Sequence, residues 1–374
     1  MSVSSSRSRL VRGDGEAAAT PIRLAWPDVG PAEAAAVAEV LESGFLTMGP
    51  KVDEFERGLA RTCDTADAVA VSSGTAALHL AVRALGIGEG DEVIVPAYTF
   101  PSTATAVVLA GARPVLVDVD PHTTNLDVER VADALTPRTR AVIAVHLFGR
   151  PLDWEELQAA VPAEVALLED AAGALGARRR GTPCGGLGVM GCLSFHPRKV
   201  VTTGEGGAVT TSDEALAATV RRLRHHGIAP GPFDIVEPFT NYRLSDLLCA
   251  IGITQLARLD ELLTTRRALA AAYTERLGDL VETPGVEEGD EHGWQAYVVQ
   301  LDGRDDVLAG LRAEGIEAQI GTHALHRLTA YRTNAAFPGA DSCFERGLAL
   351  PFHSRLADSD LDRVVATLDR LISK

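Results

Sequence analysis

Short apolar segments alternate with amphipathic ones over residues 67–168. Apolar runs of β type at residues 68–71, 93–95, 115–117, 141–145 and 165–168 are separated by helical stretches at 75–85, 102–110, 126–135 and 154–161. Continuous apolar strands that alternate with helices of about ten residues are typical of a mainly parallel sheet covered on both faces. The pattern therefore predicts an α/β domain with three layers, α/β/α.

The pattern changes after residue 211. A long helical stretch at residues 244–277 is followed by mixed strand and helix segments that reach the C-terminus. We expect a mobile N-terminal tail at residues 1–20, a large domain at residues 21–254 and a small α+β domain at residues 255–374. The tail is polar and lacks the apolar core of a signal peptide. The long helix would connect the two domains.

Composition narrows the classes of partner. The 374 residues include 51 Asp and Glu against 35 Lys and Arg, a formal net charge of -16. This charge argues against nucleic acid and anionic membranes, because both are polyanions. No run approaches the roughly 18 apolar residues that cross a bilayer. The five cysteines are scattered without CxxC spacing, so neither disulfides nor a metal site is expected, and a cytoplasmic location fits.

Residues with chemical potential follow the predicted strands at their carboxyl ends, where ligands of open parallel sheets bind. Gly74 and Thr75 follow the first strand, Phe100 follows the second, and Asp170 follows the run at 165–168. Residues 74–76 would also begin a helix, whose unpaired backbone N–H groups and dipole suit one phosphate. Taken singly, Phe100 and Asp170 are better explained as a core aromatic and a helix cap, and only the residues at 73–75 favour a phosphate site over a plain N-cap.

A single lysine, Lys199, comes after the β-type run at 192–195 and before a glycine-rich turn and a second β-type run at 208–211. On its own, a lysine at a strand end is usually a solvated charge. Together with the residues above, it matches the needs of pyridoxal 5'-phosphate (PLP). This cofactor requires a lysine for its aldehyde, a carboxylate for its pyridine nitrogen, a stacking aromatic and a phosphate cup.

The same residues resemble the DegT/StrS family of PLP-dependent sugar aminotransferases, which have the aspartate aminotransferase fold (fold type I). The resemblance extends over roughly residues 22 to 370. The matching segments are SSGTAAL at 72–78, PAYTF at 96–100, EDAA at 169–172, SFHPRK at 194–199, TGEGG at 203–207 and NYRLS at 241–245. It implies a three-layer α/β/α PLP-binding domain with a smaller C-terminal domain.

The resemblance also implies a role for each matching residue. Lys199 would form the Schiff base with the cofactor, and Asp170 would pair with the pyridinium nitrogen. Phe100 would stack on the ring, and the phosphate would be held by Gly74, Thr75, Ala76 and Ser194. Asn241 would reach the phosphate in the other subunit of a homodimer with shared active sites. Residues near the substrate would be Thr47, Met48, Gly49, Tyr98 and His326.

The implied reaction moves an amino group from L-glutamate to a keto group of a nucleotide-linked hexose, which we expect to be a 4-keto-6-deoxyhexose. A 3-keto sugar or a cyclitol ketone is an alternative acceptor. A sugar dehydratase of the same family would have a histidine in place of Lys199. A PLP-binding regulator would carry an appended DNA-binding domain, for which a tail at residues 1–20 is too short.

One position departs from the family pattern. After the EDAA segment the family often has Gln or His, which hydrogen-bonds the hydroxyl of the cofactor ring, whereas this chain has Gly173. Glycine has no side chain to make that bond. Either water or another side chain takes its place, or the cofactor is held less tightly.

Overall fold

The computed structural model describes residues 20–373, so the predicted N-terminal tail lies outside the described residues except for Thr20. A seven-stranded sheet runs through the large domain in the order β1-β10-β9-β6-β5-β2-β4. Its strands are β1 (Asp67–Val71), β2 (Glu92–Pro96), β4 (Arg113–Val117), β5 (Thr139–Val145), β6 (Ala166–Asp170), β9 (Met190–Ser194) and β10 (Gly207–Thr211). Only β10 runs against its neighbours, and the other pairs are parallel. The predicted mainly parallel sheet is confirmed.

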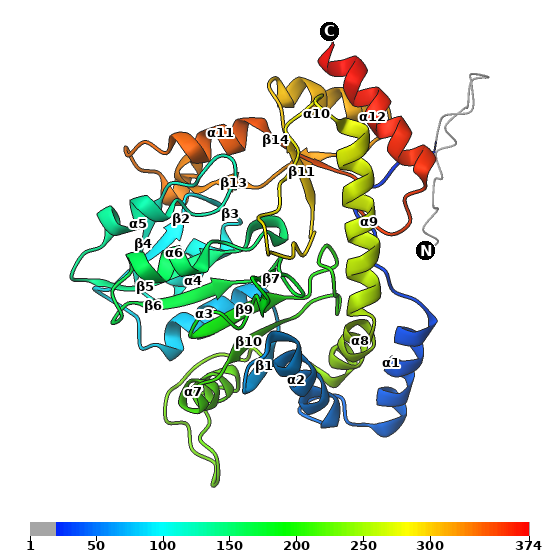
Figure 1. Cartoon of the computed structure of the whole chain (residues 1–374). Helices are drawn as coiled ribbons and strands as arrows, with labels where there is room; N and C mark the ends of the chain where they lie inside the picture. Colours follow the sequence, from blue (N-terminus) through cyan, green and yellow to red (C-terminus); the bar gives the residue numbers. More distant parts are fainter. Residues whose placement is uncertain (1–19, 374) are drawn as a thin grey trace, which may run out of the picture.

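Helices cover both faces of this sheet (Figure 1). The first face packs against α3 (Gly74–Ala84), α4 (Ser102–Leu109) and α7 (Glu214–Arg224). The second face packs against α2 (Pro50–Cys63), α5 (Val128–Ala134), α6 (Trp154–Ala160) and α8 (Asp246–Ala257). Most strands between these helices are almost completely buried, which explains their continuous apolar runs, whereas β4 at the sheet edge is only partly buried.

The predicted long helix is two helices. α8 ends at Ala257, and α9 (Leu259–Leu277) begins after Arg258, whose backbone leaves the helical region at φ -103° and ψ 8°. The first turns of α9 bury Leu262 and Leu263 in the large domain, whereas Tyr273 and Leu277 lie in the core of the small domain. In Figure 1, α9 runs from α8 up to α12, and so it connects the two domains.

A three-stranded sheet, β11-β14-β12, forms the centre of the small domain. The helices and strands of this part of the chain are β11 (Tyr297–Gln300), α10 (Arg304–Ala313), β12 (Gln319–Ile320), α11 (Pro338–Arg346), β14 (Gly347–Leu350) and α12 (Asp358–Ile372). Ile22 and Leu24 also pack in small-domain clusters. The N-terminal segment therefore packs against the small domain before α1 (Pro31–Ser43) begins.

Short elements complete the fold. β3 (Tyr98–Thr99) pairs with β13 (His323–Ala324), which ties the loop after β2 to the small domain. The others are β7 (Arg178–Arg179), β8 (Thr182–Pro183) and the 3-10 turns η1 (Leu147–Gly149), η2 (Leu325–Arg327) and η3 (Thr329–Tyr331). In residues 20–373, no helix combines the length and the apolar character that crossing a membrane requires.

Candidate active site

A cavity of about 490 Å³ lies where the carboxyl ends of β6 and β9 meet the start of α3. Six of the predicted site residues line it, namely Gly74, Thr75, Phe100, Asp170, Ser194 and Lys199. The small domain supplies the opposite wall through residues 295–296 and 319–322. Since ligand sites commonly enclose 300–1,000 Å³, this cavity is large enough for a cofactor together with part of a substrate.

Lys199 is held by a turn that begins where β9 ends. Its backbone N–H donates to the carbonyl of His196 over 2.8 Å, and Pro197 sits at the second position of this turn, where its fixed φ is favoured. Burial lowers the pKa of the Lys199 amine, and Arg198 acts in the same direction, while the charge of Asp170 opposes both. A larger fraction of this amine is therefore unprotonated, and thus nucleophilic, than for a lysine in water.

Asp170 is the last residue of β6, and its carboxylate is held from two sides. Thr103 Oγ1 donates to Oδ2 over 2.8 Å, and the Ala172 N–H donates to Oδ1 over 3.2 Å. Burial raises the pKa of Asp170, whereas these hydrogen bonds and the charge of Lys199 lower it. A buried carboxylate in this setting gains from a cationic N–H partner, which a protonated pyridine nitrogen provides.

The first turn of α3 is shaped to accept an anion. Ser73 caps the helix by accepting the Ala76 N–H over 3.1 Å, which leaves the N–H groups of Gly74 and Thr75 without an intrahelical acceptor. Ser194 packs close to this turn, because a Cβ on Gly74 would lie only 2.8 Å from the Ser194 Cβ. Ala76 does not line the cavity, and the capping bond explains why its N–H is not free.

Phe100 lies at the cavity with 62% of its surface exposed, which is unusual for a large aromatic side chain. Such a ring can cover a planar ligand by stacking. The amine, the carboxylate, the anion-binding turn and the exposed ring meet the four needs of PLP within one cavity. The residues present therefore fit this cofactor.

Five other predicted site residues lie away from this cavity. Thr47 pairs with Ser245, and the Gly49 N–H donates to Asp246 Oδ2 over 2.8 Å, which places residues 47–49, including Met48, beside the start of α8. Asn241 pairs with His225, and its Oδ1 accepts the Arg243 N–H over 3.0 Å. His326 Nε2 is 2.9 Å from Asp341 Oδ1. Within one chain these residues do not reach Lys199.

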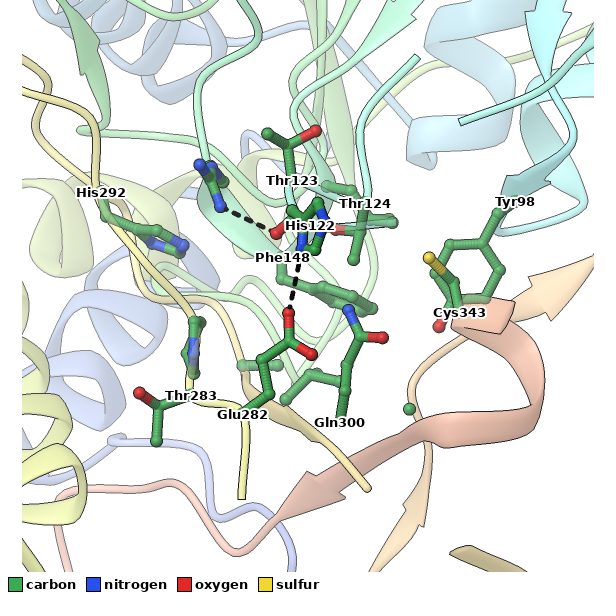
Figure 2. A pocket seen from close by; sticks show the side chains of 16 residues that line it. Tyr98, His122, Thr123, Thr124, Phe148, Glu282, Thr283, His292, Gln300 and Cys343 are labelled. Atoms are coloured by element: carbon green, nitrogen blue, oxygen red, sulfur yellow. Dashed lines mark hydrogen bonds and ion pairs between the residues drawn. The ribbon is translucent and has the colours of Figure 1, made fainter. Parts of the chain in front are cut away.

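Tyr98 faces a different cavity, shown in Figure 2, together with His122, Glu282, Gln300 and Cys343. Its ring is 1% exposed, and its hydroxyl accepts the Thr322 N–H over 3.1 Å. Neighbouring side chains of a strand point to opposite faces, and Thr99, the other residue of β3, lines the Lys199 cavity. Tyr98 therefore joins the domains and does not line the Lys199 cavity, and its contact with the sugar stays a prediction. The second cavity, about 30 Å³, has room for about one water.

Glu169 supports the site but was not among the predicted site residues. Its buried carboxylate accepts the N–H groups of Gly185, Leu187 and Gly188 over 2.6, 2.7 and 2.8 Å, and it lies 3.0 Å from His146 Nε2. His146 Nδ1 accepts the Leu152 N–H over 3.0 Å, which places a ring proton on Nε2, facing Glu169. The signal in the sequence was the glycine-rich stretch at 185–188, whose backbone N–H groups need an acceptor.

His146 and Glu169 form a buried cluster with Cys184. Their potential metal-ligand atoms lie within 4.8 Å of one another, as in a metal site. Both carboxylate oxygens of Glu169 already accept hydrogen bonds from N–H donors, so a metal would have to displace them. We therefore assign the group a structural role, which is to fix the loop that precedes β9.

Comparisons with known proteins agree with the geometry. The model of the DegT/DnrJ/EryC1/StrS aminotransferase family matches residues 27–369. GDP-perosamine synthase of Caulobacter vibrioides is 40% identical, over 94% of this chain and 98% of that protein. Its sequence is similar from end to end.

Solved structures are similar as well. The PMP form of a putative sugar aminotransferase of Streptococcus pneumoniae, Spr1654, superposes with a TM-score of 0.91 at 29% identity, over 94% of this chain and 99% of that one. DesI in the presence of its TDP-sugar product superposes with a TM-score of 0.90 at 34% identity, over 96% of this chain and 95% of that one. The predicted fold type, PLP cofactor and aminotransferase class are confirmed. The chain belongs to the DegT/DnrJ/EryC1/StrS aminotransferase family.

Proposed function

We propose that this protein moves the amino group of L-glutamate to the keto group of a nucleotide-linked 4-keto-6-deoxyhexose. One observation carries the proposal: a lysine with a lowered pKa and a buried carboxylate share one cavity with an anion-binding helix start. The similarity to GDP-perosamine synthase and to DesI with its TDP-sugar product supports a nucleotide sugar as the acceptor. The presence of Lys199 favours amino transfer over dehydration.

Each residue at the cavity has a task in this reaction. Lys199 would hold PLP covalently, and its amine, once released, would act as the general base that takes a proton onto Nζ and returns it. Bound PLP supplies an electron sink for the substrate carbon that carries nitrogen. Asp170 would keep the proton on the pyridine nitrogen, and the start of α3 would bind the phosphate. Phe100 would cover one face of the ring and exclude water from it.

The acceptor is tested with a panel of keto substrates. Purified enzyme with PLP and L-glutamate is offered 4-keto-6-deoxy and 3-keto sugar nucleotides and a cyclitol ketone, and products are identified by mass spectrometry. We expect amination of the 4-keto-6-deoxy sugar nucleotide. Turnover restricted to the cyclitol ketone would contradict the proposal.

Two variants separate the lysine from its neighbour. Lys199→Ala should lose the absorbance of the lysine-bound cofactor and the half-reaction with glutamate, whereas Arg198→Ala should keep the absorbance. Near-normal turnover of Lys199→Ala without added amine would remove the basis of the mechanism.

We further propose a homodimer in which each active site is completed by the other subunit. Large apolar side chains are exposed near the predicted residues that lie away from the cavity, among them Phe45 (62%), Met48 (48%) and, in the loop before Asn241, Phe233 (80%). Large apolar side chains exposed on two segments in this way are candidates for burial in a protein interface. A second copy covering this surface would bring Asn241 and residues 47–49 to its cavity.

Subunit mixing tests the shared site. A Lys199→Ala chain and an Asn241→Ala chain are each impaired, but a mixed dimer would contain one site built from two unaltered contributions. We expect the mixture to regain part of the activity after exchange of subunits, followed with two affinity tags. Mixed dimers that form but stay as weak as the weaker parent would contradict the shared site.

A further inference from the structure

Three glycines allow a small-domain segment to lie directly against the loop that follows Asp170. A Cβ on Gly149, where φ is +98°, would lie 2.8 Å from the Trp294 nitrogen and 3.0 Å from the Gly173 oxygen. The Gly293 N–H donates to the Gly149 carbonyl over 2.8 Å. Larger residues at 149 would push this segment away. The close packing therefore fixes the position of Gln295, the residue after Trp294, at the active-site cavity.

Gln295 takes up the space beside Gly173. Both residues line the Lys199 cavity, and a Cβ on Gly173 would lie 3.6 Å from both Cβ and Oε1 of Gln295. The Gln295 backbone N–H donates to the Phe148 carbonyl over 2.9 Å. A side chain at position 173 would point at the carboxamide of Gln295, so the glycine there leaves the position to a residue of the small domain.

One hydrogen bond orients the carboxamide of Gln295 and leaves part of its hydrogen-bonding capacity free. Gln295 Nε2 donates to the carbonyl of Arg198, the residue before Lys199, over 3.1 Å. Within residues 20–373, no hydrogen bond of Oε1 or of a second Nε2 donor is present. One N–H and the oxygen therefore remain available at the cavity, next to the segment that carries the lysine.

The chemistry of PLP indicates what this carboxamide meets, and the inference rests on the proposed function. With the ring nitrogen at Asp170, the aldehyde carbon at Lys199 and the phosphate at the start of α3, the ring hydroxyl lies on the opposite side of the aldehyde carbon from the phosphate arm. His146 also lines the cavity, but both of its ring nitrogens are engaged, one with Glu169 and the other with the Leu152 N–H. Ser73, Thr75, Ser102 and Ser194 belong to the phosphate end.

We propose that Gln295 hydrogen-bonds the ring hydroxyl oxygen of the cofactor, in place of a side chain at position 173. The free N–H of the carboxamide would donate to this oxygen in its deprotonated form. Such a donor withdraws charge from the oxygen, so the oxygen holds the proton on the neighbouring lysine-linked nitrogen less strongly. Gln295 would thus lower the pKa of the lysine-linked nitrogen and increase the affinity for the cofactor.

The test replaces the carboxamide with apolar groups of similar size. In Gln295→Leu, the pKa of the lysine-linked nitrogen, followed by the absorbance of bound PLP against pH, should rise by about one unit. PLP affinity, measured by equilibrium dialysis, should fall on the order of tenfold. Gln295→Met provides a second apolar variant with an unbranched chain, should the leucine variant not fold.

Two further variants sharpen the result. Gln319→Leu makes the same chemical change at another glutamine of the cavity, which accepts a hydrogen bond from Arg198, and should leave the titration where it is. Gly173→Gln combined with Gln295→Ala moves the carboxamide to the neighbouring backbone and should restore the lower pKa.

Folded Gln295→Leu or Gln295→Met protein with the wild-type titration and PLP affinity would overturn the inference. Failure of the proposed role of Lys199 looks different, because wild-type protein would then show no lysine-bound PLP absorbance to titrate. None of these measurements requires the sugar substrate, so an error in the proposed acceptor would not affect them.

Discussion

Thr103 provides a direct test of how the protein controls Asp170. Its hydroxyl is fully buried and donates to Asp170 Oδ2 over 2.8 Å. Thr103→Val removes this donor with almost no change of shape, and the Ala172 N–H remains on the other carboxylate oxygen. Burial already raises the pKa of Asp170, so loss of a donor to the charged form should raise it further.

The size of the effect follows from the kind of bond. A hydrogen bond to a charged group contributes about 1.5–3 kcal/mol, which corresponds to roughly one to two pKa units. PLP with a protonated ring nitrogen binds best when Asp170 is ionised. The variant should therefore bind PLP about ten- to a hundredfold more weakly at pH values below the Asp170 pKa. The loss should fade at higher pH, where the carboxylate is ionised in both proteins.

The assay is the PLP dissociation constant measured across pH for wild type, Thr103→Val and Thr103→Ser. The serine variant keeps the hydroxyl and should follow the wild type. A valine variant whose affinity is unchanged at every pH would refute the reasoning. So would a loss that is the same at low and high pH, since this would indicate a packing defect and not a change in ionisation.

Two other predictions concern buried polar groups, His292 and Glu169, that do not line the cavity. His292 is buried, its Nδ1 accepts the Trp294 N–H over 2.8 Å, and burial lowers its pKa from 6.5 to about 3, with the charge of Arg150 acting in the same direction. Between pH 7 and 5, His292 therefore takes up a proton only in the unfolded state. This difference should lower the free energy of unfolding by about 2 kcal/mol over that range. His292→Asn, which keeps an acceptor but does not titrate, should lack this part of the fall in urea titrations, and equal slopes would contradict the argument. Glu169→Gln should lower the unfolding free energy by about 3 kcal/mol, because an NH₂ group would face N–H donors that lose their acceptor. Exposed Glu156→Gln is the control, and equal midpoints for both variants would rule out the role assigned to Glu169.

The residues proposed to bind the cofactor could be placed at the cavity from sequence because their signals are local. Apolar runs identified the strands, and a polar or aromatic residue directly after a strand of a parallel sheet lies at the ligand edge wherever the strand is placed. Asp170 at the end of β6 and Thr75 in the first turn of α3 are examples. The N–H groups of a helix start are likewise available for any residue type, which is why the anion-binding turn could be inferred.

The prediction for Tyr98 did not take into account the direction of the side chain along a strand. A one-residue step along β3 reverses the direction of the side chain, so Thr99 faces the cavity and Tyr98 faces the small domain. The sequence pattern of two residues is too short to reveal this alternation. The break at Arg258 between α8 and α9 lies within the large domain, because Leu262 and Leu263 after it still pack in the large-domain core.

The sequence by itself determined the class of the fold, the cofactor and the lysine and carboxylate that would serve it, since each depends on short motifs and on the period of apolar residues. Tertiary structure decided which distant segments complete the site. β9 lies beside β6, which brings the turn with Lys199 near Asp170 across 29 residues of sequence, and three mutually packed glycines bring Gln295 to Gly173. Such contacts depend on the order of the strands in the sheet and on the packing of one domain against the other. Both are set by the packing of the whole chain, which no local sequence pattern encodes.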